Sequence, residues 1–249
     1  MKILKLFLPL VLLSASCSAQ TQKQFDIKKI YITNSSKDKA LRDFEKKYDA
    51  FFEDENYVVR KTYSGEWGGS VYFKSKKSGV EYTCSATCPV IINKLNNKYY
   101  LTNMLAHLSG ISEIVEIENP DLMSVAAPPK QYREGNIIIV PAGSDEQQST
   151  KGTLKVIDSI GVLVIGSFPY KNELFHIVTD FNGTYLCSVE SNRFRTIDTV
   201  SKVSLWSYDN EVKVTKDNHY IIPFTDDDAN GYIDIVDIVD NKISIMRVR

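Results

Sequence analysis

The sequence has few of the residues on which enzymes most often depend. Its 249 residues include only three histidines, His107, His176 and His219, and four cysteines. It contains no Gly-x-Ser-x-Gly elbow, no Gly-x-x-x-x-Gly-Lys loop, no His-Glu-x-x-His pair and no Gly-x-Gly-x-x-Gly turn. The templates for α/β-hydrolases, P-loop NTPases, zinc proteases and dinucleotide-binding enzymes are therefore missing, which favours a role other than catalysis.

The chain also lacks an excess of charge of one sign. Its formal net charge is −1, from 30 basic and 31 acidic residues, and no basic cluster stands out. A nucleic-acid-binding domain needs a basic stripe or patch, so nucleic acid is not an expected partner. No apolar run reaches the length of about 20 residues that spans a bilayer as a helix.

The first 19 residues have the pattern of an export signal. Two lysines precede the apolar run Leu6–Leu13, and small residues follow it, as in secretory signal peptides. The segment 13–17, Leu-Ser-Ala-Ser-Cys, resembles the lipobox of bacterial lipoproteins, which implies that Cys17 is lipidated and begins the mature chain. The alternative is cleavage after Ala19 without a lipid. We expect a periplasmic or outer-membrane-anchored lipoprotein, or a secreted protein in the second case.

The remaining cysteines are odd in number. Cys84 and Cys88 are close enough in sequence to close a small disulfide loop, and either could instead pair with Cys187. Disulfides are common in exported proteins, whereas no second cysteine pair or histidine near Cys84 completes a zinc tetrahedron. We therefore predict a disulfide between Cys84 and Cys88 rather than a metal site.

From Tyr57 to the end, the chain alternates short strand-like runs with turn residues. The runs are rich in Val, Ile, Tyr and Thr, and the turns include Asn96-Asn97, Asn182-Gly183 and Asp240-Asn241. Strands spaced in this way indicate antiparallel meanders. The predicted fold is mainly β and β-propeller-like, with a barrel or a sandwich as the alternative.

Other segments complete the expected domain, which covers residues 20–249. Gln20–Lys29 is polar and is interpreted as a tether. Lys37–Phe52 has aromatic residues at steps of three and four, which predicts an amphipathic N-terminal helix. The Pro- and Gly-containing stretch 120–152 interrupts the strands, either as a long loop or as a seam between two halves.

The strongest chemical signal is the segment Thr225–Asp237, which reads TDDDANGYIDIVD. Calcium takes six to eight oxygen ligands, and loops that bind it place oxygens at alternate positions around a turning glycine, here Gly231. The predicted ligands are Asp226, Asp228, Asn230, Tyr232 through its carbonyl, and Asp234, with Asp237 as a sixth.

The flanks of this segment are strand-like rather than helical. Residues Asp226–Ile235 therefore resemble the calcium loops of FG-GAP/VCBS-type β-propeller repeats more than an EF-hand. The resemblance implies a structural Ca²⁺ ion that holds the blades in place. The alternative is an acidic hairpin, because Asn230-Gly231 is a strong type I′ turn signal.

Two further candidate sites carry a functional and a structural interpretation. Trp67, before Gly68-Gly69, could stack on a ligand or pack in a tight turn. His107 and Ser109 could line a surface pocket, but a lone histidine in an apolar context is usually structural.

These observations together predict an exported β-rich lipoprotein that acts as a binding or interaction module. Its partner would be a protein or a glycan, and its contact with the membrane would be the lipid anchor alone. The alternative is a cell-envelope hydrolase, whose catalytic carboxylates the sequence does not identify.

Overall fold

The computed structural model describes residues 23–33, 35–36, 50–62, 68–141, 143–144, 146–205, 212–215, 218–224 and 234–248. In these residues the fold is mainly β, as predicted, and it consists of four larger sheets and one separate hairpin. Among the described strands, every pair is antiparallel except the one between the first and last strands, β1 (Asp26–Ile32) and β20 (Lys242–Val248). No sheet closes on itself in this part of the chain, and the propeller is not confirmed.

The four larger sheets take up their strands largely in chain order. The first sheet has the order β2 (Phe52–Glu53), β3 (Tyr57–Lys61), β4 (Ser70–Ser75), β5 (Glu81–Ser85) and β9 (Ser124–Val125). The second has the order β12 (Leu154–Ile160), β8 (Ile111–Ile117), β7 (Lys98–Leu105) and β6 (Pro89–Leu95). The exceptions are β9, which joins the first sheet, β12, which joins the second, and β1, which joins the last.

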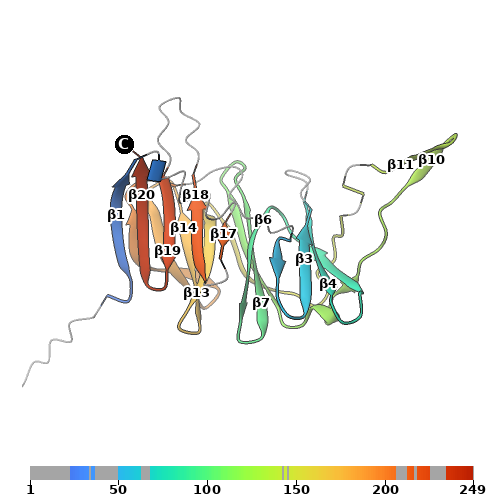
Figure 1. The fold of residues 1–249 in the computed structure, drawn as a ribbon, viewed down its shortest axis with the longest axis horizontal. Coiled ribbons are helices and arrows are strands. Elements are labelled where there is room, and N and C mark those ends of the chain that lie inside the picture. The colour runs from blue at the N-terminus through green and yellow to red at the C-terminus, as the bar shows by residue number, and fades with distance from the viewer. Residues whose placement is uncertain are drawn as a thin grey trace, which may run out of the picture.

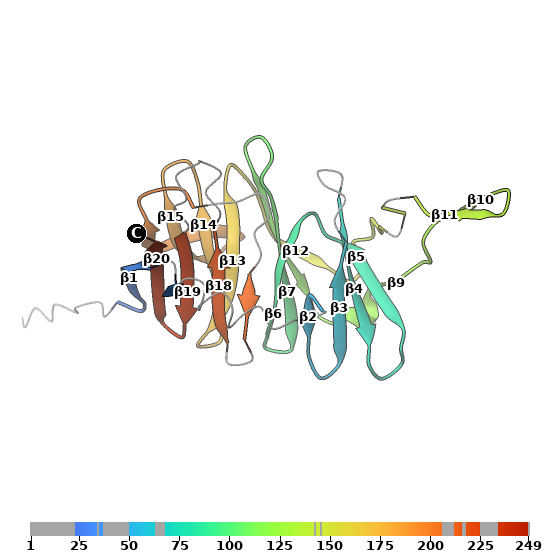
Figure 2. The same cartoon turned by 45° about the horizontal axis from the view of Figure 1, so that its top comes forward.

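The third and fourth sheets are formed by the second half of the chain. The third has the order β13 (Leu163–Tyr170), β14 (Glu173–Thr179), β15 (Thr184–Glu190) and β16 (Arg193–Ser201). The fourth has the order β1 (Asp26–Ile32), β20 (Lys242–Val248), β19 (Asp234–Val239), β18 (His219–Pro223) and β17 (Lys213–Val214). Along the long axis of the molecule the third and fourth sheets lie together, the second is central and the first lies beyond it (Figures 1 and 2).

The second sheet is buried on both faces. Leu101, Val115 and Ile117 pack against the first sheet. Ile114 and Ile157 pack on the opposite face against the third sheet. Side chains alternate between the two faces of a strand, so the neighbouring residues Ile114 and Val115 point into different cores. This two-sided burial makes the second sheet the middle layer of the molecule.

Short turns with positive φ fix the strand register at one end of the sheets. Leu95 pairs with Lys98 across Asn96-Asn97, whose φ angles are 51° and 62°. Lys171-Asn172 and Ser191-Asn192 have the same conformation. Asparagine adopts positive φ more readily than most residues, and such two-residue turns match the twist of a hairpin. We call this the turn end; it lies at the bottom of Figure 1.

The N-terminal expectations need correction. The polar segment interpreted as a tether includes the start of β1, which pairs in parallel with β20 from Asp26 to Ile32. The predicted helix Lys37–Phe52 lies largely outside the described residues, but its last residue belongs to β2 rather than to a helix. Phe52 pairs with Val59 of β3, and this pairing decides its conformation over the helical spacing seen in the sequence.

The stretch 120–152 connects the first two sheets. After a short 3₁₀ helix, η2 (Pro120–Leu122), it adds β9 to the edge of the first sheet. It then forms the hairpin β10 (Tyr132–Glu134) and β11 (Ile137–Ile139). The stretch then returns past the first sheet, where the Ser70 hydroxyl accepts a hydrogen bond from the backbone N–H of Gln147, 2.7 Å away. The stretch therefore crosses from the second sheet to the first and back.

Phe25 fixes the start of β1 to the third sheet. The residue is only 2 % exposed, and its ring lies edge-on to Phe175, with ring centroids 4.8 Å apart. We predict that Phe25→Ala lowers the free energy of unfolding by about 3–5 kcal/mol, the usual cost of removing a buried aromatic side chain. Urea denaturation of both proteins measures this difference.

The control is Tyr31→Ala, on the same strand but with 53 % of the residue exposed. It should change the free energy of unfolding by less than about 1 kcal/mol. Equal losses in the two variants would show that Phe25 does not fix β1 to the body.

Candidate functional site

Most of the predicted calcium loop lies outside the described residues. This applies to Asp226, Asp228, Asn230 and Tyr232. Asp234 begins β19, opposite Arg247. Asp237 is also in β19, and its carboxylate forms a hydrogen bond with the Nε2 atom of His219. Of the proposed ligands, therefore, Asp237 is engaged within the fourth sheet, and the calcium site stays a prediction.

The three cysteines after Cys17 form no disulfide in the structure. Cys84 is buried in β5, and Cys187 is buried in β15. Burial raises the pKa of the Cys84 thiol to about 12. In this unbonded state Cys84 is a protonated core residue at neutral pH, and the disulfide between Cys84 and Cys88 stays a prediction.

The other sequence candidates lie at loops of different sheets. Trp67 lies outside the described residues, while Gly69 makes such a close approach that a Cβ atom would lie 2.5 Å from the Ala86 carbonyl oxygen. Close backbone packing explains why glycine occupies position 69. His107 and Ser109 are in the turn between β7 and β8, where His107 is half-buried and Ser109 is exposed.

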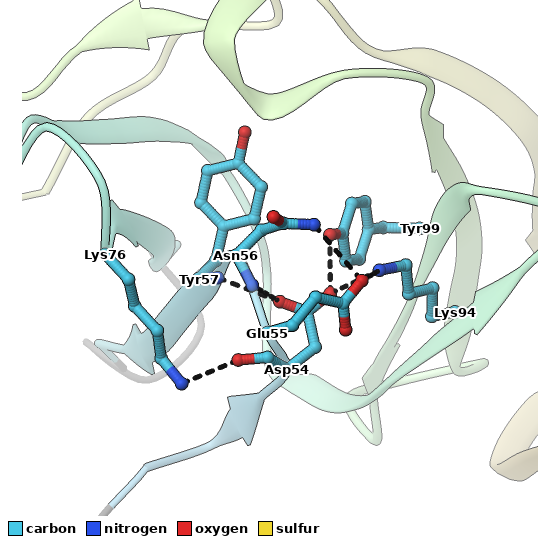
Figure 3. A network of polar contacts seen from close by, with 7 residues as sticks. All are labelled: Asp54, Glu55, Asn56, Tyr57, Lys76, Lys94 and Tyr99. Carbon is cyan, nitrogen blue, oxygen red and sulfur yellow. Dashed lines mark hydrogen bonds and ion pairs between the residues drawn. The ribbon is translucent and has the colours of Figure 1, made fainter.

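A polar network that the sequence did not reveal lies at the turn end, between the first and second sheets (Figure 3). Its centre is the carboxylate of Asp54, in the turn between β2 and β3. This carboxylate accepts hydrogen bonds from Lys94 Nζ and Tyr99 Oη, each at 2.7 Å. It also accepts the backbone N–H groups of Asn56 and Tyr57, both at 2.8 Å.

The charges of this network are mutually stabilised. Burial raises the pKa of Asp54, but the hydrogen bonds from Lys94 and Tyr99 outweigh it, so this pKa lies below its usual value. Burial opposes the charged form of Lys94, while Asp54 and Glu55 raise its pKa above the usual range. Asp54 is therefore ionised and Lys94 protonated at neutral pH.

The network joins layers rather than binding a substrate. Asp54 is in the first sheet's turn, whereas Lys94 and Tyr99 belong to β6 and β7 of the second sheet. Lys76 donates to the Asp54 carbonyl at 2.6 Å and ties a second turn to it. Each carboxylate oxygen of Asp54 has a protein partner. We interpret the network as a structural clamp.

A buried Ser–His pair lies at the junction of the second and third sheets. The Ser167 hydroxyl is 2.8 Å from His176 Nδ1 and 2.8 Å from the Thr102 hydroxyl. This contact resembles a nucleophile–base pair, but Ser167 and His176 are only 2 % and 1 % exposed. Burial lowers the pKa of His176 to about 3, so the ring is neutral. The pair is a satisfied polar link inside the core.

The end opposite the turn end carries exposed apolar side chains, and we call it the loop end. Leu108, Ile160 and Phe181 are 94 %, 76 % and 84 % exposed there. Leu108 is in the β7–β8 turn, Ile160 ends β12, and Phe181 is in the β14–β15 turn. No local pattern in the sequence marks this cluster, since apolar residues also occur in each adjoining strand.

Direct contacts show that these turns are neighbours. The backbone N–H of Gly161 donates to the Gly110 carbonyl at 2.9 Å, which joins the Ile160 turn to the Leu108 turn. Leu163 lies against Gly110 and pairs with Thr179, two residues before Phe181. The three exposed side chains therefore belong to one contiguous group of turns.

Comparison of the chain with protein-family models, with curated proteins and with solved structures found no match. Within the described ranges, no helix has the length and apolar character needed to cross a membrane. In the same residues, no group of three or more His, Cys, Asp or Glu side chains is placed to hold a metal ion.

The clamp should stabilise the protein in a pH-dependent way. We predict that Lys94→Met lowers the free energy of unfolding at pH 7 by about 1.5–3 kcal/mol, because it removes a hydrogen bond to a charged, part-buried carboxylate. The folded pKa of Asp54 is depressed, so this contribution is present above about pH 4 and is lost as the pH falls further. Denaturant titrations at pH 7 and pH 3 measure the shrinking difference.

Lys98→Met is the matched control, since Lys98 pairs with Glu116 inside the second sheet and joins no layers. The two side chains are 37 % and 17 % exposed, and because the pair makes no contact between sheets we expect a loss of less than about 1 kcal/mol. An equal loss in both variants would contradict the assignment of Lys94 as the clamp.

The buried imidazole of His176 predicts a second pH dependence. The unfolded chain binds a proton at this residue near pH 6.5, whereas the folded chain does so only near pH 3. Stability should therefore fall as the pH drops below about 6.5, with a slope of up to about 1.4 kcal/mol per unit. His176→Gln should remove this slope between about pH 6 and pH 4.5.

His107→Gln, at the β7–β8 turn, should keep the wild-type slope because His176 remains. Denaturation midpoints across this pH interval test both variants. A slope that survives in His176→Gln would place its origin elsewhere.

Proposed function

We propose that this protein is an exported, lipid-anchored binding module that contacts a partner protein of the cell envelope through its loop end. The observation that carries the proposal is the grouping of Leu108, Ile160 and Phe181 on neighbouring turns. Single exposed apolar residues are ordinary on protein surfaces, whereas a contiguous group is typical of an interaction site.

The chemistry of these side chains favours a protein over a glycan. Two of the three are aliphatic, and they offer no hydrogen bonds to sugar hydroxyls. Burial of one such side chain contributes about 1.5–3 kcal/mol, so three of them would supply the apolar centre of a larger contact.

The position of the N-terminus supports an outward-facing loop end. The backbone N–H of Asp26 donates to the Asn241 carbonyl at 2.8 Å, which places the start of β1 at the turn end. The chain from Cys17 to Lys23 spans at most about 20 Å. A lipid on Cys17 would therefore hold the turn end near the membrane and leave the loop end directed away from it.

The remaining predictions fit this proposal but do not carry it. A Ca²⁺ ion at Asp226–Asp237 would have a structural role in the fourth sheet. A propeller-like arrangement of the four larger sheets is likewise a proposal.

The test is site-specific photo-crosslinking in the producing bacterium. A benzophenone side chain at position 108 should form a protein adduct of defined mass, and one at Asn97 of the turn end should not. In the Leu108 crosslinker background, Ile160→Ser with Phe181→Ser should reduce the adduct about tenfold or more, because each lost contact is worth over 1 kcal/mol.

These surface changes should alter the free energy of unfolding by less than about 0.5 kcal/mol each, which urea denaturation checks. Adducts of equal yield from positions 97 and 108, or an adduct that is insensitive to the serine variants, would contradict the proposal.

A further inference from the structure

The β10–β11 hairpin extends away from the rest of the molecule (Figures 1 and 2). Among the described residues, its two strands pair only with each other. Its apolar side chains are exposed: Tyr132 is 55 %, Ile137 68 % and Ile138 56 % exposed. An isolated two-stranded hairpin is only marginally stable in water, and a bare strand edge is a site for adding another strand.

The turn geometry determines which backbone groups of β11 are unused. Glu134 pairs with Ile137 across the two-residue turn Gly135-Asn136. In such a turn the N–H of Ile137 points to the carbonyl of Glu134. Backbone groups alternate in direction along an antiparallel strand, so the N–H and C=O of Ile138 point outward, away from β10.

Two copies of β11 can pair symmetrically through these outward groups. A two-fold axis perpendicular to the sheet keeps each side chain on its own face, so one residue must lie opposite its own copy. Ile138 is the middle residue of β11, and centring the axis there lets the two Ile138 residues exchange both hydrogen bonds. Ile137 then lies opposite Ile139 of the second copy.

This register is apolar at every position of β11. On one face it brings together Ile137 and Ile139 of both copies, beside Tyr132, which pairs with Ile139 within each hairpin. Aromatic and β-branched neighbours across strands are favourable pairs. On the other face Ile138 meets Ile138.

The β10 edge lacks this complementarity. A symmetric pair centred on the middle of β10 would place Arg133 opposite Arg133, and one centred a residue later would place Glu134 opposite Glu134. Like charges directly opposite each other destabilise a strand pair. The charges therefore favour self-pairing through β11 and disfavour it through β10.

We propose that β11 is a self-association site, at which two copies of this chain join their hairpins into one four-stranded sheet with the order β10–β11–β11–β10. The site is separate from the loop-end turns and does not depend on the partner protein proposed above. The contact is small compared with the interfaces of permanent dimers, so the association is reversible and concentration-dependent.

The experiment is sedimentation equilibrium of the exported protein, made as Cys17→Ser so that no lipid is attached. The wild-type chain should pass from monomer to dimer at micromolar concentrations. Ile138→Lys and Ile138→Glu should each remain monomeric over the same range, because equal charges then meet at the axis. An equimolar mixture of these two variants should recover the dimer, since lysine then lies opposite glutamate.

Arg133→Glu is the control, because Arg133 is opposite Ile138 in the same hairpin but belongs to the β10 strand. It should leave the dimer in place, as should Leu108→Ser at the loop end. A wild-type chain that stays monomeric would overturn the proposal. So would a dimer that persists in both Ile138 variants, or a mixture that remains monomeric.

Discussion

Leu101 and Thr102 are consecutive residues of β7, and both are completely buried. This is the arrangement on which the rest of the fold depends, because alternating side chains then require a packed layer on each face of the second sheet. Leu101 belongs to the core shared with the first sheet, and Thr102 bonds to Ser167 of the third. Loss of either neighbouring sheet would expose the buried apolar side chains of that face to water.

Each of these two layer contacts combines apolar packing with polar links. Asp54 joins Lys94 and Tyr99 between the first and second sheets, and Ser167 joins Thr102 and His176 between the second and third. Apolar packing alone tolerates sliding of one sheet on another, whereas hydrogen bonds have narrow requirements on distance and angle. The polar links therefore fix the positions of the sheets relative to one another, and the apolar contacts supply most of the stability.

The sequence predicted the strands best where β-branched residues and Asn turns occur together. β7 begins directly after Asn96-Asn97 and β20 directly after Asp240-Asn241, two of the turns that the sequence predicted. β16 (Arg193–Ser201) carries no such signal, since an edge strand with mostly exposed side chains has the composition of a loop. β1 was missed for the same reason, and its pairing with β20 joins opposite ends of the chain, which no local pattern can show.

The candidate sites were less accessible to prediction than the fold. The Asp54 clamp unites residues 40 and 45 positions apart through pairing between sheets, so only the turn around Asp54 had a local signal. Exposure of Leu108 or Phe181 likewise depends on where each strand ends. Apolar residues inside the strands and at their tips look alike in sequence, and the structure alone separates the two groups.

The two ends of the sheets differ in a way that has consequences for function. Two-residue turns at one end hold the register through residues such as Asn97 and Asn172, whose positive φ leaves little freedom for other side chains. At the other end β7 and β8 are joined by the longer connection Ala106–Gly110, although Leu108 within it also has a positive φ, 52°. The exposed side chain of Leu108 therefore stands on backbone that its turn holds in place, as a surface for recognition requires.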